Sequence, residues 1–396
     1  MNSIEEQTPE EFLDIIPIKD SEFDSHMDYV LSEPQSAGIL KFIFPNMETE
    51  EAKGLLRTIH DKRDFQQKVM APLLNHLQKQ TTAGITDSGF EKIKNDLPAT
   101  FITNHRDIVL DSSFLCYVMF QRNIETCEIA IGNNLFVNRW VESLVRINKC
   151  FVVKRNLPIR EALAAAKQLS GYIRFAHDKK KQSIWIAHRE GRAKDSNDLT
   201  QESLIKMLAI AGEGTIVERL KALNLSPIAL SYEYDPNDYL KLQEFLLKRR
   251  DPHFKKSKQD DFISMQTGIM GYKGHINYGF AGSINKEIDA LEKQNDKHST
   301  YQEVCKIIDR AIHSNYVIYP CNYIAYDMRF STDRFTGRYT AEQKAQFEQY
   351  MATQLAKITV PDVTAEEQAY LQEMMLKLYS NTLVNKLSVV TADDKL

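Results

Sequence analysis

Short apolar segments alternate with longer amphipathic ones between residues 96 and 335, and this alternation constrains the fold more than any other feature. The short segments are rich in β-branched and aromatic residues, as strands are. The longer ones, such as residues 159–178, repeat apolar side chains every three or four positions, as amphipathic helices do. Strands separated by helices predict an α/β fold, with a mixed, mostly parallel sheet flanked by helices. The expected strands are residues 100–104, 126–132, 148–154, 183–188, 227–234, 274–280 and 315–320.

The segments on either side of this region have the periodicity of helices. Residues 1–95 predict a helical N-terminal region without any grouping of side chains that suggests catalysis. Residues 341–382 predict two amphipathic helices, followed by a loose tail. The chain is therefore expected to divide into the helical region 1–95, an α/β domain at 96–335, and C-terminal helices with a tail at 336–396. A charge-rich stretch at 236–262 is interpreted as a solvated helix and loop.

Composition narrows the class of protein. With 396 residues, of which 43% are hydrophobic, the chain can bury a large core. The formal net charge is only −4, so bulk charge does not indicate a nucleic-acid partner, and any anion site must be local. The five cysteines form no CxxC pair, which favours reduced thiols in a cytoplasmic protein over disulfides or a zinc site. The acidic N-terminus does not resemble a signal peptide, and no run of about 18 apolar residues could span a bilayer.

The first candidate chemical group follows the expected strand 100–104. His105 is succeeded by two carboxylates, Asp107 and Asp111, in an apolar helical pattern. A histidine at a strand end can act as a general base when a carboxylate fixes its tautomer and stabilises the imidazolium. Taken alone, such a histidine is more often a capping or core residue. Asp107 sits where a helix N-cap is expected, whereas an unpaired Asp111 would be costly inside its apolar run, so Asp111 is the predicted partner.

Basic residues follow two other expected strands. Arg155 comes directly after Lys154 at the end of one strand, and Gly191, Arg192 and Lys194 lie in the loop after another. The glycine can adopt a positive φ and turn the backbone sharply. Arg192 and Lys194 could then form charge-assisted hydrogen bonds with a phosphate. For each group alone, exposed cations beside a strand end or a charged loop are the plainer explanation.

Taken together and in this order, these groups resemble the motifs of the glycerophospholipid acyltransferase family, which includes 1-acylglycerol-3-phosphate and glycerol-3-phosphate acyltransferases. The resemblance covers roughly residues 98–235. The family's motifs are an Asn-His pair followed by an acid, an arginine after an apolar strand, a Glu-Gly pair followed by a hydroxyl residue and an arginine, and an apolar strand entered through a proline. The matching residues are Asn104, His105 and Asp111, then Arg155, then Glu190, Gly191 and Arg192, then Pro227.

The sequence departs from the family pattern at two places. Five residues separate His105 from Asp111, whereas the family usually has four, so Asp107 stays an alternative partner for the histidine. Arg192 follows Gly191 directly, without the usual hydroxyl residue, which leaves the choice of substrate open.

The resemblance implies an O-acyltransferase of phospholipid biosynthesis. His105 would be the general base, oriented by Asp111, and would act without a covalent intermediate. Arg155, Arg192 and Lys194, with the Glu-Gly pair, would bind the phosphate of the acceptor. That acceptor would be 1-acyl-glycerol-3-phosphate (lysophosphatidate) or glycerol 3-phosphate, and the acyl donor a thioester of acyl carrier protein or coenzyme A. No metal or bound cofactor is implied.

A lipid acceptor also implies a place at the membrane. We expect a cytoplasmic protein attached peripherally to the membrane surface, with helices of 1–95 or 341–382 as candidates for the contact. The alternative for these helices is packing on the α/β core. Two other functions stay open. One is an acyltransferase for an amino-acid-derived lipid, which would need no phosphate clamp. The other is a non-catalytic lipid- or acyl-carrier-binding protein of the same fold.

Overall fold

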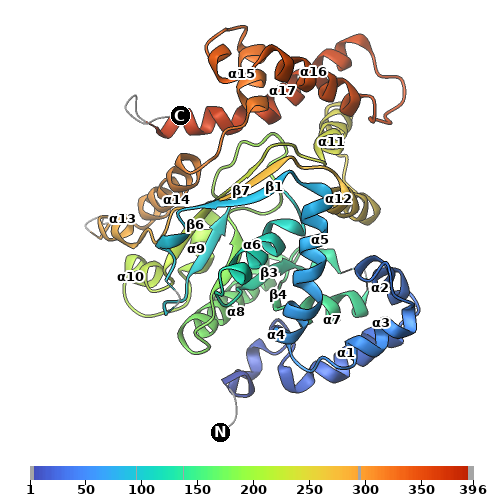
Figure 1. The fold of residues 1–396 in the computed structure, drawn as a ribbon. Coiled ribbons are helices and arrows are strands. Elements are labelled where there is room, and N and C mark those ends of the chain that lie inside the picture. The colour runs from blue at the N-terminus through green and yellow to red at the C-terminus, as the bar shows by residue number, and fades with distance from the viewer. Residues whose placement is uncertain (1–3, 95, 137, 293–295, 391–396) are drawn as a thin grey trace.

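The computed structural model describes residues 4–94, 96–136, 138–292 and 296–390. A seven-stranded sheet runs through the centre of the molecule, with helices on both faces (Figure 1). The strands are β1 (Gly84–Ser88), β2 (Thr100–Thr103), β3 (Glu128–Gly132), β4 (Cys150–Val153), β5 (Ile184–Ala187), β6 (Leu225–Tyr232) and β7 (His275–Phe280).

The helices fall into an earlier and a later group along the chain. The earlier helices are α1 (Phe23–Ser32), α2 (Ser36–Ile43), α3 (Thr49–Leu56), α4 (Lys62–Phe65), α5 (Ala71–Thr81), α6 (Leu110–Gln121), α7 (Arg139–Ile147) and α8 (Ile159–Asp178). The later helices are α9 (Glu202–Leu208), α10 (Ile216–Lys221), α11 (Asp238–Arg250), α12 (Lys258–Met270), α13 (Asn285–Asp289), α14 (Lys297–Ser314), α15 (Pro320–Phe330), α16 (Ala341–Leu355) and α17 (Ala365–Val389).

The strand order is β1-β7-β6-β2-β5-β3-β4. Among the described strands, β6 and β7 alone pair in antiparallel fashion, and every other neighbouring pair is parallel. The predicted fold class, a mixed and mostly parallel sheet flanked by helices, is confirmed. Strands β2, β3, β4, β5 and β6 therefore end at the same side of the sheet, called the carboxyl edge below. In open α/β sheets, this edge is where ligands bind.

Two hydrophobic layers hold the helices onto the sheet. Successive side chains of a strand point to opposite faces, so Phe101 of β2 belongs to one layer and Ile102 to the other. The Phe101 layer includes α5 and α6, and the Ile102 layer includes α8, α10 and α14. Helix α6 is buried from Leu110 to Met119 without interruption, as expected for a helix that is apolar on all sides.

The end regions form smaller hydrophobic clusters of their own. Helices α1 to α4 pack with α7 around side chains such as Phe23, Phe65 and Trp140. At the other end, α15, α16 and α17 pack with α11 around Phe347, Met375 and others. Figure 1 shows α15 to α17 gathered at one end of the molecule. The helices predicted within 341–382 are confirmed as α16 and α17.

Three predictions about individual elements are wrong. Residues 315–320 form no strand, because Val317 bonds through its amide to the side chain of Ser231 rather than to a ladder, and α15 begins at Pro320. The helical prediction for 1–95 fails at Gly84–Ser88, which is the edge strand β1. The stretch 236–262 is not simply solvated, because α11 buries Asp238, Lys241 and Glu244 against charged or polar partners.

The remaining structural expectations concern the cysteines, membrane-spanning helices and the end of the chain. All five cysteines are free and buried. No helix in the described parts of the chain is both long and apolar enough to cross a bilayer. The tail expected from Ser388 onward is wrong for its first two residues, since α17 continues to Val389, and residues 391–396 lie outside the described residues.

Candidate active site

The carboxyl edge gathers the predicted functional residues from strands that are far apart in sequence. β2 leads to His105, β4 to Arg155, β5 to the loop with Arg192, and β6 to Asp235. The register places Thr103 of β2 opposite both Ala187 of β5 and Ile228 of β6. The loops after β2 and β5 therefore leave the sheet side by side.

Asn104 fixes the direction in which the chain leaves β2. Its side-chain amide is buried and bonds to both backbone groups of Leu230 in β6, with Nδ2 donating to the carbonyl at 3.0 Å and Oδ1 accepting from the amide at 2.7 Å. The side chain thus replaces one further rung of the ladder between β2 and β6. This bonding holds the backbone immediately before His105 in place.

His105 and Asp111 are paired. Nδ1 of His105 lies 2.8 Å from Oδ2 of Asp111, and the same oxygen accepts the backbone amide of Arg106 at 2.7 Å. Because a carboxylate accepts hydrogen bonds, Nδ1 carries the proton and Nε2 is left as the basic nitrogen. The ring of His105 packs edge-on against Trp185, and its side chain is 14% exposed. This is the geometry of an oriented general base.

Asp107 has a different structural task. Its Oδ1 accepts the amides of Val109 at 2.9 Å and Leu110 at 2.7 Å, at the beginning of α6. Burial, with a further contribution from the charge of Asp111, raises the pKa of the Asp107 carboxyl. The helix begins only at Leu110, so the residue that lengthens the His-to-Asp spacing is absorbed in the non-helical turn before it.

Two tyrosines beside Asp111 escaped the sequence analysis. The hydroxyl of Tyr278 donates to the backbone carbonyl of Asp111 at 2.8 Å. Burial and the charge of Asp111 raise the pKa of Tyr232 well above its ordinary value. Both residues lie in strands whose sequences show only apolar and aromatic side chains, so no local motif could have separated them from ordinary core residues.

Arg106 was also missed, although it joins the loop after His105 to the C-terminal helices. Its guanidinium lies 2.6 Å from Oδ2 of Asp198 and 3.4 Å from the hydroxyl of Thr382 in α17. The hydroxyl of Tyr316 donates to the same Asp198 oxygen at 2.8 Å. Burial alone would lower the pKa of Arg106, but Asp198 and the other acidic groups nearby together raise it.

Helix α17 also holds the loop that follows β5. The side-chain amide of Asn381 donates to the carbonyl of Asp195 at 2.7 Å, and that of Asn385 donates to the carbonyl of Ser196 at 3.2 Å. Lys377 forms an ion pair with the Asp195 carboxylate at 3.2 Å. The C-terminal helices are therefore part of the framework of this site.

The second and third motifs meet at an ion pair. Arg155 Nη1 lies 3.6 Å from Oε1 of Glu190, whose side chain is 68% exposed. Gly191 has a φ of +69°, the left-handed conformation that the sequence analysis anticipated. The loop after β5 thus turns beside Arg155, at the rim of the carboxyl edge.

The positive charge of Arg192 acts on two buried carboxylates, those of Asp107 and Asp235. One guanidinium nitrogen, Nη1, is buried and has no hydrogen-bond partner among the described residues. Its charge opposes the rise in the pKa of Asp107. Burial alone would raise the pKa of Asp235, but Lys241 and Arg192 together lower it. A cation with a free donor at this position suits an anionic ligand.

Lys194 is engaged elsewhere. Its ammonium lies 2.7 Å from Oε1 of Glu244 in α11, a carboxylate that also binds Lys248 at 2.8 Å and Lys256 at 3.2 Å. Burial raises the pKa of Glu244, but the hydrogen bonds from Lys194 and Lys248 outweigh it and lower the pKa to about 2. The sequence placed Lys194 beside Arg192, and the fold gives the two cations different surroundings.

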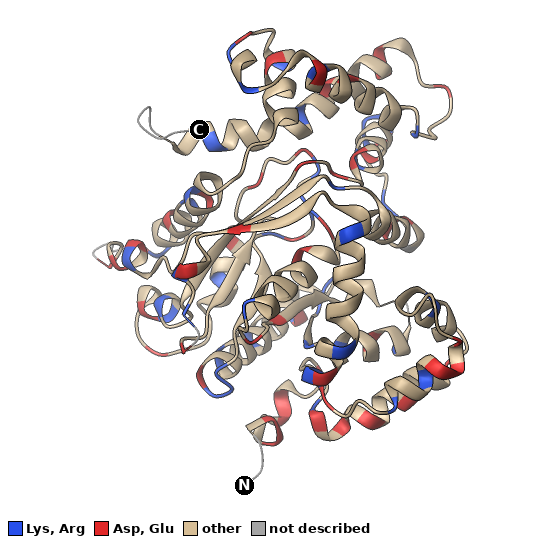
Figure 2. Cartoon of the chain, in the orientation of Figure 1, with Lys and Arg blue, Asp and Glu red and all other residues tan. Residues whose placement is uncertain are grey.

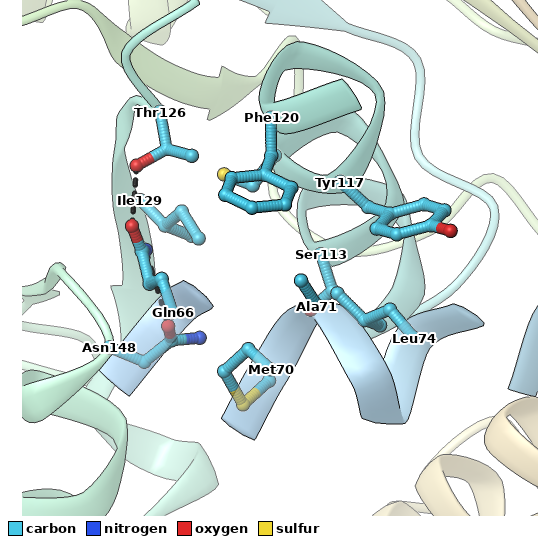
Figure 3. A pocket seen from close by; sticks show the side chains of 11 residues that line it. Gln66, Met70, Ala71, Leu74, Ser113, Tyr117, Phe120, Thr126, Ile129 and Asn148 are labelled. Carbon is cyan, nitrogen blue, oxygen red and sulfur yellow. Dashed lines mark hydrogen bonds between the residues drawn. The ribbon is translucent and has the colours of Figure 1, made fainter. Parts of the chain in front are cut away.

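A separate pocket lies beside α6, away from His105. Figure 3 shows it between residues 66–74, α6 and β3, with Phe120 and Met70 among its walls. Its cavity volume of about 20 Å³ is room for roughly one water molecule. The pocket is therefore too small to hold an acyl chain.

No group of three or more metal-ligating side chains occurs in the described ranges.

Part of the chain is similar to a known protein family. Residues 84–223 match the family model described as Acyltransferase, and the matched segment contains His105, Asp111, Arg155 and Arg192. No curated protein is similar enough in sequence to count as a relative. Among solved structures, the crystal structure of the 1-acyl-sn-glycerophosphate (LPA) acyltransferase PlsC from Thermotoga maritima is 10% identical, with a TM-score of 0.37. The match covers 72% of this chain and 93% of that one.

Proposed function

We propose that this chain, an acyltransferase by its family domain at residues 84–223, moves a fatty acyl group from a thioester to a hydroxyl of a glycerol phosphate. The acceptor would be 1-acyl-glycerol-3-phosphate or glycerol 3-phosphate, as in phospholipid biosynthesis. The observation that carries the proposal is the 2.8 Å bond between His105 and Asp111 at a strand end. Arg155 after β4 and Arg192 after β5, on either side of β3 at the carboxyl edge, supply the positive charge that a phosphate needs.

The proposed reaction is a direct transfer. Nε2 of His105 takes the proton of the acceptor hydroxyl while its oxygen attacks the thioester carbonyl. The tetrahedral oxyanion then collapses, the carbon–sulfur bond breaks, and the departing thiolate takes the proton from the imidazolium. Because a thioester is already activated, neither a covalent enzyme intermediate nor a metal or bound cofactor is required. Asp111 stabilises the imidazolium between the two proton transfers.

Arg155 and Arg192 would hold the acceptor phosphate, with Glu190 and Gly191 shaping the loop between them. Binding a phosphate here would provide the partner that Nη1 of Arg192 lacks. Lys194 would contribute only through the field of its ion-pair cluster with Glu244. The donor would be a thioester of acyl carrier protein or coenzyme A, and the enzyme would work at the cytoplasmic surface of the membrane.

One feature favours a second acceptor class. The Glu190 carboxylate is exposed at the rim and sits against Arg155. A carboxylate there could bind the ammonium group of an amino-acid-derived lipid, and Arg155 would then need no phosphate. The acceptor assay below separates the two classes.

The test uses the purified full chain with labelled palmitoyl-coenzyme A and palmitoyl-acyl carrier protein. Each donor is offered with lysophosphatidate, glycerol 3-phosphate or a lysolipid built on ornithine. We expect a product with a phosphorylated acceptor, and a loss of about 10²–10⁴-fold in the His105→Ala variant with an unchanged circular dichroism spectrum. A product with the ornithine lipid alone would favour the second class. Transfer by the His105→Ala variant at the wild-type rate would refute the role of His105.

A further inference from the structure

The beginning of α8 stands out of the molecule. Residues 158–164 are all exposed, whereas the helix is buried on its inner face from Leu169 onward. Ile159 is 93% exposed and Leu163 is 59% exposed, although both are large aliphatic side chains. Burying such side chains stabilises a protein, so a site that leaves both in water calls for a partner.

The exposed side chains of this segment are arranged by type. Successive residues of an α-helix are rotated by about 100°, so Ile159, Leu163, Arg160 and Lys167 all lie within about 100° of one another. Glu161 falls on the opposite side. Arg160 and Lys167 are exposed and have no ion-pair partner among the described residues. One side of the helix thus offers two aliphatic groups next to two free positive charges, which is the composition of an interfacial helix.

This side of α8 adjoins the candidate active site. The helix begins four residues after Arg155, on the chain that leaves β4 at the carboxyl edge. Arg155 in turn contacts Glu190 in the loop that carries Arg192. A surface bound by the first turns of α8 would therefore lie next to the residues assigned to the acceptor phosphate.

We propose that the first turns of α8 dock the enzyme on an anionic phospholipid bilayer, with Ile159 and Leu163 inserted among the acyl chains. Arg160 and Lys167 then lie at the level of the lipid phosphates. This inference rests on the proposed function with the lipid 1-acyl-glycerol-3-phosphate as the acceptor, and identifies the surface through which the site meets that lipid. A bilayer-bound acceptor would reach Arg155 without leaving the headgroup layer.

Charge favours α8 over the N-terminal helices as the membrane contact. Charge and apolar exposure together favour a bilayer over an acidic carrier protein as the partner of α8. The N-terminal helices carry acidic residues, which Figure 2 shows along α1 and α3 and which include Glu50 and Glu51, so an anionic surface would repel them. An acidic carrier protein could pair with Arg160 and Lys167. It would gain little from Ile159, whose side chain is almost fully exposed at the first residue of α8. Insertion into a fluid phase uses both the charges and the aliphatic groups.

Vesicle co-sedimentation of the full chain tests the proposal, because binding needs no turnover. Vesicles contain phosphatidylcholine with phosphatidylglycerol, or phosphatidylcholine alone. We expect the double variant Ile159→Asn/Leu163→Asn to bind mixed vesicles at least about tenfold more weakly than wild type. Arg160→Gln and Lys167→Gln should each weaken binding about fivefold on mixed vesicles and leave binding to neutral vesicles unchanged. Ile159→Trp should shift its emission to the blue when mixed vesicles are added.

The matched control is Leu97→Asn. Leu97 is 46% exposed but precedes β2, at the opposite edge of the sheet, so this variant should bind as wild type does. Unchanged binding by the double variant, or equal loss in Leu97→Asn, would overturn the proposal. So would wild-type protein that ignores vesicles but binds acyl carrier protein through Ile159. A catalytically inactive protein that still docks through α8 would refute the proposed function and leave this surface in place.

Discussion

Gly268 of α12 lies directly against the carboxylate of Asp107. A Cβ at position 268 would fall 1.9 Å from Oδ2 of Asp107, closer than any two such atoms can approach. Asp107 in turn holds the amides of Val109 and Leu110 at the beginning of α6, the helix that carries Asp111. Helix α12 is thus seated on the turn that sets the distance between His105 and its acid.

Gly268→Ala should therefore disturb both stability and catalysis. Either α12 or Asp107 has to move, which we expect to cost roughly 1–3 kcal/mol of unfolding free energy. The turnover number should fall as well, because the turn before Asp111 shifts. Urea unfolding and kcat measure the two effects. Gly54→Ala is the matched control, since nothing lies within 4 Å of that helical glycine and alanine should stabilise α3 slightly. Equal behaviour of the two variants would contradict the close packing.

Asp111→Asn and Asp107→Asn should have opposite consequences. Asparagine at 111 can no longer stabilise the imidazolium, so kcat should fall by about 10²–10⁴-fold with little change in melting temperature. Asparagine at 107 can still accept the amides of the following turn, so most activity should remain. Steady-state kinetics and thermal unfolding of both purified variants decide the matter. An inactive Asp107→Asn beside an active Asp111→Asn would transfer the acid's role to Asp107.

Arg155→Ala and Arg192→Ala should raise KM for the phosphorylated acceptor more than for the thioester. Loss of one charge-assisted hydrogen bond costs roughly 1.5–3 kcal/mol, which corresponds to about 10- to 160-fold in KM. Lys194→Ala provides the contrast, because its ammonium is held by Glu244 and should leave both KM values close to wild type. A large acceptor KM effect in Lys194→Ala alone would place the phosphate at the Glu244 cluster.

Asp238 should make stability depend on pH. Burial, helped by the charge of Asp235, raises its pKa from 3.8 to about 7. Between these values the unfolded chain has lost the proton that the folded protein keeps, so stability falls as pH rises from about 4 to 7. The slope approaches about 1.4 kcal/mol per pH unit and vanishes above pH 7. Chemical unfolding at several pH values should show this slope in wild type and lose it in Asp238→Asn. A slope that survives in the variant would assign it to another group.

The site's first pair could be predicted from sequence because local chemistry restricts both residues. A carboxylate at position 111 within an apolar helix needs a partner, and His105, at the end of the preceding strand, can supply one. The number of residues between His105 and Asp111 did not by itself identify the acid, because the distance between their side chains depends on where α6 begins. Likewise, no local signal separates Arg192 from Lys194. Their different surroundings come from Glu244 on α11, which the fold brings to the loop after β5.

The errors in the fold have similar causes. β1 is a polar edge strand whose only neighbour is β7, so it lacks the apolar run that identifies a buried strand. Residues 315–320 have such a run, yet Tyr316 is buried beside Arg106 and Asp198 rather than in the sheet. The pairing of Arg106 with Asp198 belongs to no motif, since it joins two loops that meet only after the sheet has formed.

Because Asn381 and Asn385 hydrogen-bond to the loop after β5, that loop can reach its final structure only after α17 has been synthesised. That loop leaves the ribosome long before α17 does, since Ser196 and Asn385 are 189 positions apart. At roughly 5–20 residues per second, the delay is about 10–40 seconds. During this interval the sheet can form, but the loop that bears Arg192 lacks the hydrogen bonds and the ion pair that α17 makes with Asp195 and Ser196. A nascent chain arrested before residue 365 should therefore have a folded sheet but no catalytic activity.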